Sequence, residues 1–300
     1  MYFYRFASRF DMNRYFSEKV YEDDRYLVYK NSNSFPIAFG VNELVANLQL
    51  DFNNAVKNQD KILNSIEGIE KGQENYVDYF KPLAFGAIET ENLVAEDVNK
   101  EKGTAVYKRE DTSKEAIVRY RITPQTDLTY YFLAPDSLNF VDEYSVLLNG
   151  RWFTHSKKNM QRQLWQIADK AAGKESVLEF RFKSDKVDIS HAGVFRADVD
   201  QIQKVLEKRK AQGLQVEKFS NTHIIGSVDI TDDSQFMMTS IPYSAGWKVK
   251  VDGKDVPTSK AWNSLLSFPI TSGQHKVEFV FSQKGRVTGA VLTLISLTTL

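Results

Sequence analysis

Apolar and polar residues alternate in short runs near the end of the chain, and this pattern predicts half-buried β-strands. Between residues 247 and 251, one tryptophan and two valines alternate with two lysines, and the favoured hairpin dipeptide Asp252-Gly253 follows. The segment before them, 236–241, is apolar and extended. A further alternating run, 273–281, begins after a Ser-Gly turn. These runs together predict an antiparallel sheet.

The same order of strands and turns occurs once more, earlier in the chain. Residues 129–134 lead through a turn to 144–148, which end at the second favoured hairpin dipeptide, Asn149-Gly150. Residues 173–182 then repeat the closing strand. Each copy is preceded by one further strand, at residues 116–123 and 224–230. The repeat predicts two antiparallel β-sandwich units of the jelly-roll or immunoglobulin type, since nothing between the strands is a helical crossover.

Two segments have helical rather than strand periodicity. Residues 53–66 place their apolar side chains on one helical face, with an asparagine at the start as the N-cap and Gly68 at the end. A second helix is predicted to begin after Asp198 and to end at Gly213, which we expect to be a left-handed stop. This second helix separates the two sandwich units.

The amino-terminal third predicts a smaller α+β region. Residues 26–31 and 35–41 are expected to form an edge hairpin, and the charged segment 96–113 reads as a linker or a surface hairpin. A domain boundary near residue 100 follows. The predicted fold class is mainly β, and the chain as a whole is α+β. The predicted order of its parts is an N-terminal α+β piece (1–99), a first β-sandwich with its helix (100–213), a second β-sandwich (214–285) and the start of a truncated transmembrane helix (286–300).

The two ends of the chain differ in character. Residues 1–10 lack an apolar run long enough for a signal peptide. Residues 287–300 carry no charge and follow Lys284 and Arg286 directly. A spanning helix needs roughly 20 apolar residues, so this segment cannot cross a bilayer alone and is interpreted as part of a transmembrane helix. The alternative is a buried terminal strand or helix of the second sandwich.

The amino-acid composition of the chain limits the kinds of site that it can contain. The 39 basic and 39 acidic side chains cancel, which gives no electrostatic argument for nucleic acid or for an acidic membrane surface. The absence of cysteine excludes disulfides, thiolate metal sites and cysteine nucleophiles. We find no nucleotide-binding or hydrolase motif and no carboxylate pair in an apolar setting, so no catalytic residue, cofactor or metal is predicted. The histidines are too widely spaced for a metal pair: His155, His191, His223 and His275.

Aromatic residues make up 13% of the chain, and in a sheet protein most of them belong to the core. Those in connections could instead stack on the apolar face of a sugar ring. The candidate glycan-stacking residues are Tyr243 and Trp262 in the later unit and Trp152 and Trp165 in the earlier unit. Trp247 alternates with Val249 and Val251, so we expect it to be buried in the core against them and Phe279.

Several short motifs are spread over most of the chain. They are Tyr29-Lys30-Asn31, Phe35-Pro36-Ile37-Ala38-Phe39, Asp78-Tyr79-Phe80-Lys81-Pro82, Ala211-Gln212-Gly213-Leu214, Thr222-His223-Ile224-Ile225-Gly226, Thr239-Ser240-Ile241-Pro242-Tyr243, Gly246-Trp247-Lys248-Val249, Val251-Asp252-Gly253-Lys254 and Gly273-Gln274-His275-Lys276-Val277-Glu278-Phe279. Through these motifs, the chain resembles the carboxyl-terminal extracytoplasmic region of the YfhO family of bacterial multi-pass membrane proteins, above all over residues 199–281.

This resemblance implies a membrane-embedded glycosyltransferase that uses lipid-linked sugars and decorates lipoteichoic-acid-like polymers in the cell envelope of Gram-positive bacteria. The family's catalytic carboxylate lies between early transmembrane helices, so the resemblance gives this chain no catalytic residue. Its expected place is the outer side of the cell membrane, and its expected partners are envelope glycan or teichoic-acid polymer, its own transmembrane region and the membrane. The alternative is a structural or protein-interaction module that binds no sugar. A stand-alone hydrolase is disfavoured by the missing acid-base pair.

Overall fold

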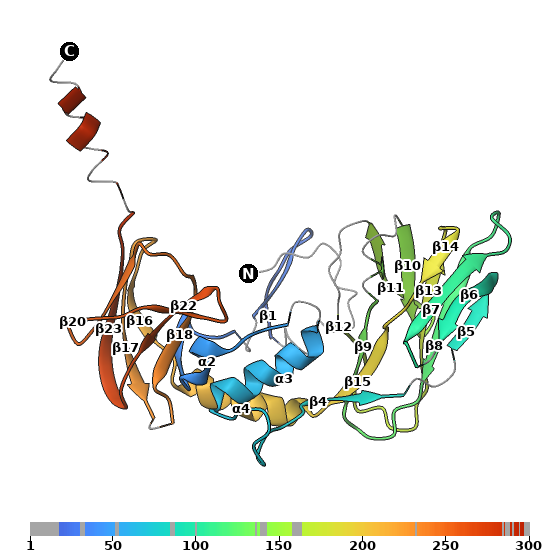
Figure 1. The fold of residues 1–300 in the computed structure, drawn as a ribbon, viewed down its shortest axis with the longest axis horizontal. Helices are drawn as coiled ribbons and strands as arrows, with labels where there is room; N and C mark the ends of the chain where they lie inside the picture. Colours follow the sequence, from blue (N-terminus) through green and yellow to red (C-terminus); the bar gives the residue numbers. More distant parts are fainter. Residues whose placement is uncertain are drawn as a thin grey trace. The chain divides into compact units, whose positions relative to one another are not determined.

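The computed structural model shows a mainly β chain, with 48% strand and 15% helix, which confirms the predicted class. It describes residues 18–30, 34–51, 54–84, 88–99, 101–135, 137–138, 143–157, 164–231, 233–283, 285, 289, 291–293 and 295–296. The chain forms two compact units, and each contains two segments of the sequence (Figure 1). The first unit comprises residues 1–34 and 79–199, and the second comprises 35–78 and 200–300.

Two antiparallel sheets make the body of the first unit. One has the order β11 (Arg151–Lys157), β10 (Glu143–Leu148), β13 (Ser176–Phe182), β8 (Ala116–Ile122) and β5 (Ile88–Glu91). The other has the order β12 (Leu164–Ala168), β9 (Thr129–Leu133), β15 (Gly193–Ala197) and β4 (Phe80–Leu83). Burial alternates residue by residue along β8 and β13, because every second side chain faces a core that includes Tyr120, Phe132 and Phe180.

Two smaller sheets complete the first unit. In one, β6 (Leu93–Asn99) and β7 (Thr104–Arg109) form a hairpin, and β14 (Lys186–Asp188) pairs with β7. The charged segment 96–113 is therefore largely a surface hairpin within a sheet and not a boundary between domains. In the other, β1 (Glu18–Glu22) pairs with β2 (Leu27–Lys30).

The second unit is also built on two antiparallel sheets. One has the order β16 (Gln215–Phe219), β17 (His223–Ile230), β23 (Gly273–Phe281), β19 (Trp247–Val251) and β20 (Lys254–Val256). The other has the order β21 (Ser259–Ala261), β22 (Leu265–Pro269), β18 (Phe236–Pro242) and β3 (Ala38–Val41). Their core includes Val249, Phe268 and Phe279. Trp247 is only half-buried: it packs at the edge of this core, with its ring centroid 5.1 Å from that of Phe281.

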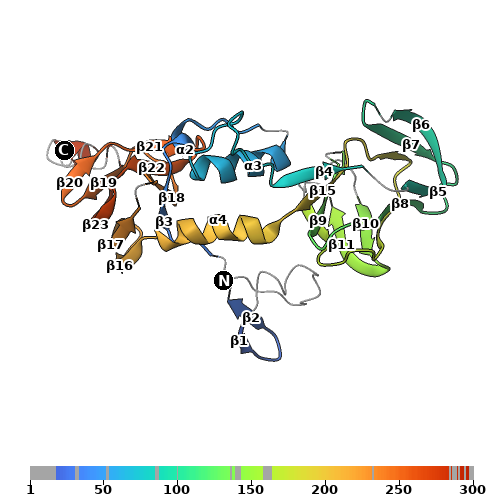
Figure 2. The ribbon, with the colours of Figure 1, turned by 90° about the horizontal axis from the view of Figure 1, so that it is seen from below.

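The sheets of the second unit are accompanied by the helices α2 (Leu44–Asn47), α3 (Ala55–Ile66) and α4 (Val199–Ala211) (Figure 2). The α3 helix begins as its sequence predicts, because the Asn54 side chain accepts a hydrogen bond from the Lys57 amide at 3.0 Å. Gly68, just beyond its end, has a φ of 80°.

The expected hairpin between residues 26–31 and 35–41 does not form. The β2 strand pairs with β1, whereas β3 pairs with β18 in the second unit. All four β3 residues are buried. The strand therefore adds to the apolar edge of a sheet whose other strands come from distant parts of the sequence. The structure therefore divides residues 1–99 between the two units, which differs from the expected single N-terminal piece.

Gly213 follows α4 but does not take the expected left-handed conformation. It forms an isolated antiparallel bridge with Phe39, and the next amide, that of Leu214, donates to the Ala38 carbonyl at 2.8 Å. A Cβ atom at position 213 would lie 2.2 Å from Cγ of Pro36. Glycine is thus required here because any side chain would overlap the ring of Pro36.

Both predicted hairpin dipeptides form two-residue turns with left-handed backbone angles. Asn149 and Gly150 have φ values of 52° and 74°, and Asp252 and Gly253 have φ values of 51° and 78°. Such angles are required by the turn type that matches the twist of paired strands. These two turns set the register of β10 with β11 and of β19 with β20.

The described residues of the apolar carboxyl-terminal segment, at 289, 291–293 and 295–296, are helical. Their large side chains are exposed: Val291, Leu292 and Ile295 have exposed fractions of 47%, 62% and 53%. Within the part of the chain that the structure describes, no helix has both the length and the apolar character needed to span a membrane.

Candidate functional site

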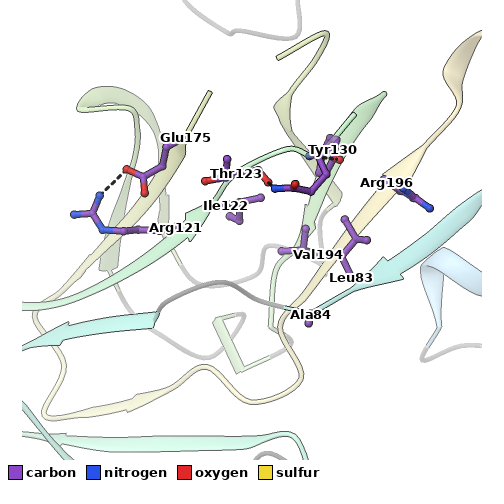
Figure 3. Close-up of a pocket in the computed structure, with 10 residues that line it drawn as sticks. Leu83, Ala84, Arg121, Ile122, Thr123, Tyr130, Glu175, Val194 and Arg196 are labelled. Carbon is purple, nitrogen blue, oxygen red and sulfur yellow. Dashed lines mark hydrogen bonds and ion pairs between the residues drawn. The ribbon is translucent and has the colours of Figure 1, made fainter. Parts of the chain in front are cut away.

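A pocket of about 440 Å³ opens in the first unit, at one edge of the two large sheets (Figure 3). It is lined by the end of β8, the loop that follows it, and parts of β9, β15 and β4. Leu83, Ile122 and Val194 supply its apolar surface. Thr123, Gln125 and Tyr130 add hydrogen-bonding groups to the same wall.

Tyr130 and Arg196 are direct partners across β9 and β15, so their side chains leave the same face of this sheet. The Tyr130 hydroxyl accepts hydrogen bonds from the backbone amides of Gln125 at 2.9 Å and Thr126 at 3.2 Å. The loop after β8 thereby fixes the position of the phenol ring beside the pocket.

Arg196 offers a donor that the described residues leave unused. Its Nε atom is buried and has no hydrogen-bond partner within the described part of the chain. A buried guanidinium N–H without a partner costs free energy. Arg196 also lines the pocket, and a guanidinium is a suitable group to hold a polar or anionic ligand there.

Arg121 lies on the other side of the pocket and is already engaged. Its Nε donates to Glu89 at 2.7 Å and its Nη1 donates to Glu175 at 2.8 Å (Figure 3). The hydrogen bonds that Arg121 donates to Glu89 and to Glu175 both raise the pKa of its guanidinium. These pairs neutralise Arg121 and occupy Glu175, the one carboxylate among the residues that line the pocket.

The pocket offers groups that can bind a ligand. Glycoside hydrolysis uses two carboxylic groups on opposite sides of the scissile bond, and the described residues that line this pocket supply one, which is paired with Arg121. An apolar surface flanked by hydroxyl, amide and guanidinium groups matches a sugar, which has apolar C–H faces and hydroxyl edges.

The two tryptophans predicted for stacking in the first unit have different surroundings. Trp165 is 4% exposed and stacks between Phe132 and Phe180, at centroid distances of 6.1 Å and 5.9 Å. It is a core residue that presents no ring face to a ligand. Trp152, on β11, is 57% exposed. Neither residue lines the pocket.

Tyr243 and Trp262, the other two candidates, are half-buried in the second unit. The Lys260 ammonium lies 5.3 Å from the centre of the Tyr243 ring. Trp262 occupies the turn between β21 and β22 with a φ of 49°, an unusual value for a large side chain. The four predicted residues are thus shared between two units and do not form one site.

Sequence reasoning missed both Tyr130 and Arg196. A signal for Arg196 is present, because it stands two residues after Val194 and a strand places such positions on one face. A charged residue on a core-facing row marks the place where a sheet opens to solvent or ligand. No comparable signal distinguishes Tyr130 from the neighbouring aromatic residues of β9.

No group of three or more histidine, cysteine, aspartate or glutamate side chains is placed to hold a metal ion in the described ranges. His223 Nε2 lies 2.7 Å from the Glu278 carboxylate, and His275 Nδ1 lies 2.8 Å from that of Asp252. His191 is exposed, and the side chain of His155 lies outside the described residues.

A comparison with known protein families identifies the family of this chain. The profile of the family described as bacterial membrane protein YfhO matches residues 4–293, and the chain belongs to this family. The resemblance found in the sequence motifs is thereby confirmed, and with it the association with a membrane. No curated protein matches the chain.

Solved structures give only distant likenesses. The chain is similar to a β-glucuronidase from Ruminococcus gnavus in complex with D-glucuronic acid, with a TM-score of 0.24 and 8% identity, covering 70% of this chain and 46% of that one. It is also similar to the GH31 α-xylosidase of Xanthomonas citri, with a TM-score of 0.20 and 8% identity over 62% of this chain and 13% of that one. An anti-sigma factor domain-containing protein has a TM-score of 0.19 and 11% identity, covering 56% of this chain and 75% of that one. The chain spans less than half of either glycosidase, and likenesses at these scores carry no argument about function.

Proposed function

We propose that this chain is the extracytoplasmic domain of a membrane-embedded glycosyltransferase that decorates lipoteichoic-acid-like envelope polymers. In this proposal the chain binds or positions the acceptor and carries out no sugar transfer itself. The pocket beside Arg196 holds one unit of the acceptor glycan or polymer. The observation that carries the proposal is the buried Arg196 Nε–H, which has no partner among the described residues, next to the apolar surface of Leu83 and Val194.

The chemistry of the pocket supports an acceptor site in two ways. Arg196 can donate to a phosphate or a sugar hydroxyl, and a guanidinium binds phosphate oxygens in a charge-assisted geometry. The apolar surface can cover a sugar face or a glycerol backbone. Binding at one pocket would be weak, but a polymer with many identical units raises the effective concentration at the site.

The test is a titration of the chain with a glycerol-phosphate oligomer and, separately, with a neutral oligosaccharide, followed by calorimetry or NMR. Arg196→Gln is expected to weaken binding of the preferred ligand about 10- to 100-fold, since a hydrogen bond to a charged group contributes roughly 1.5–3 kcal/mol. Lys186→Gln is the matched control, because it removes one positive charge from an exposed position of β14 in the same unit. It should bind as the unchanged chain does.

Two results would contradict the acceptor site. One is that neither ligand binds at millimolar concentration, and the other is that Arg196→Gln and Lys186→Gln bind equally well. The chain mixed with an activated sugar and an acceptor is expected to give no product. Transfer by the chain alone would contradict the proposed division between acceptor binding and catalysis.

A second candidate function is a protein-interaction module that binds no sugar. The observation that favours it is that β6, an edge strand of its sheet, exposes two valines, Val94 and Val98, which are both 49% exposed. Exposed apolar residues on an unpaired strand edge can dock another protein. Failure of both ligands in the titration would favour this candidate.

A further inference from the structure

Four short segments close one end of the second sandwich: residues 219–222, 243–247, 262–264 and 281–283. The strands β16, β18 and β23 end here, and β17, β19 and β22 begin here. Backbone hydrogen bonds join the segments directly, from Phe281 to Thr222 at 2.8 Å, from Ser282 to Gly246 at 2.9 Å and from Tyr243 to Ser264 at 2.8 Å.

Each of these segments contributes an aromatic side chain to what we term the aromatic end: Phe219, Tyr243, Trp247, Trp262 and Phe281. Phe219 is 63% exposed, although it is a fully apolar ring. The other four residues are half-buried, and Trp247 and Phe281 pack on each other with their ring centroids 5.1 Å apart.

The four segments of the aromatic end contain no aspartate or glutamate. Glu278, a carboxylate of β23 near this end, is paired with His223 at 2.7 Å. Three exposed lysines stand beside the four segments, Lys218, Lys248 and Lys260. The opposite end of the same sandwich differs, since Asp233 and Asp252 lie in its connections. The chain as a whole is neutral, so this distribution is local.

Aromatic rings flanked by lysines are typical of protein surfaces at the membrane–water boundary. The rings occupy the headgroup region, and the lysines keep their ammonium groups in water or beside anionic lipid. The aromatic end is also continuous with apolar sequence, because β23 ends there and the chain continues to the exposed helical residues Val291, Leu292 and Ile295.

We propose that the aromatic end is a membrane-docking face, with Phe219 inserted among the lipid headgroups and the three lysines facing anionic lipid. The occupant is a bilayer surface, and the arguments are the charge distribution, the continuity with the apolar segment and membership in a membrane protein family. The inference does not depend on the glycan pocket, which lies in the other unit. Failure of sugar binding would leave it unaffected.

The absence of cysteine allows a direct test with single labels on the full chain. Asn221→Cys places a nitroxide at the aromatic end while keeping Phe219, and Lys254→Cys places one at the opposite end. With vesicles of phosphatidylcholine and phosphatidylglycerol, the label at 221 should gain contact with oxygen and lose contact with a water-soluble nickel chelate. The label at 254 should remain in water.

A second pair of variants separates docking by Phe219 from tethering by the apolar segment. Phe219→Ser should return the label at 221 towards its aqueous accessibility, whereas Val216→Ser, which removes an exposed apolar side chain elsewhere on β16, should not. Omitting phosphatidylglycerol should weaken the effect. The proposal is overturned if the chain does not bind vesicles, if it binds while both labels stay in water, or if label contacts change equally without vesicles through self-association.

Discussion

The guanidinium of Arg209 has no exposed surface and donates from Nη2 to Oδ2 of Asp233 at 2.8 Å. Its Nε donates to Glu67 and its Nη1 donates to the Ser234 hydroxyl at 2.7 Å. The cluster joins α4 to the end of α3 and to the connection between β17 and β18, all within the second unit. A buried arginine is tolerated here because each of its nitrogens has a polar partner.

Replacing Arg209 with methionine is therefore expected to destabilise the second unit by about 3–5 kcal/mol, because Glu67 and Asp233 lose their buried partner. The measurement is urea unfolding followed by circular dichroism. Lys208→Met is the control: Lys208 contacts Glu67 at 2.9 Å and Asp233 at 2.6 Å, but its side chain is 49% exposed. Its loss should cost less than about 1 kcal/mol, and equal costs for the two variants would contradict the role of burial.

The same cluster predicts a loss of stability in acid. Burial alone would raise the pKa of Asp233, but hydrogen bonds from Lys208 and Thr231 and the charge of Arg209 outweigh it and hold the pKa well below its ordinary range. A depressed folded-state pKa contributes stability that is fully present above the unfolded value, near pH 4, and that is lost as pH falls through the folded value.

Comparing the unchanged chain with Asp233→Asn between pH 7 and pH 2 should show this effect, within the range of roughly 2–4 where carboxylates take up protons. The difference in free energy of unfolding should be largest near neutral pH and should shrink below about pH 4. Asp255→Asn changes an exposed carboxylate of β20 and is the control, expected to change the free energy of unfolding at pH 7 by less than about 1 kcal/mol. A constant difference for Asp233→Asn would show that the ionised carboxylate does not stabilise the fold.

Phe279 and Trp247 are expected to differ as anchors of the second core. Phe279 is fully buried and meets Phe268 edge-on at 5.6 Å, so Phe279→Ala should cost about 3–5 kcal/mol by leaving a cavity. Trp247 is only half-buried, so Trp247→Ala should cost clearly less. Thermal unfolding of both variants shows which substitution costs more stability. A greater loss of stability for Trp247→Ala would support the prediction that Trp247 lies in the centre of the core.

Local signals in the sequence predicted the alternating strands, the turns at the two hairpin dipeptides and the start of α3, but the hairpin expected between 26–31 and 35–41 was wrong. The Asn149-Gly150 and Asp252-Gly253 turns and the Asn54 cap depend on neighbouring residues alone, so no distant partner had to be known. The pairing of β3 with β18 could not be predicted in this way. It joins residues 38–41 to 236–239, and many short apolar segments would satisfy the same sheet edge.

The candidate site was harder to predict for the same reason. Trp165 and Trp152 both lie in strands, β12 and β11, but Trp165 packs into the core and Trp152 lies at the surface. Aromatic content alone cannot distinguish these environments. The pocket beside Arg196 arises where four strands and a loop meet, so it depends on sheet order, which the sequence pattern does not specify.

The apolar segment at 286–300 gives the last prediction. Its described large side chains, Val291, Leu292 and Ile295, are exposed, so they add little to the core of the second sandwich. Deleting residues 286–300 should therefore leave the melting temperature nearly unchanged and raise solubility, because exposed apolar surface promotes association. As a comparison, Phe279→Ala removes a side chain that belongs to this core and should lower the melting temperature clearly. If the deletion lowers it as much, the segment is part of the sandwich, as in the alternative of a buried terminal element, and it is not available to enter a membrane.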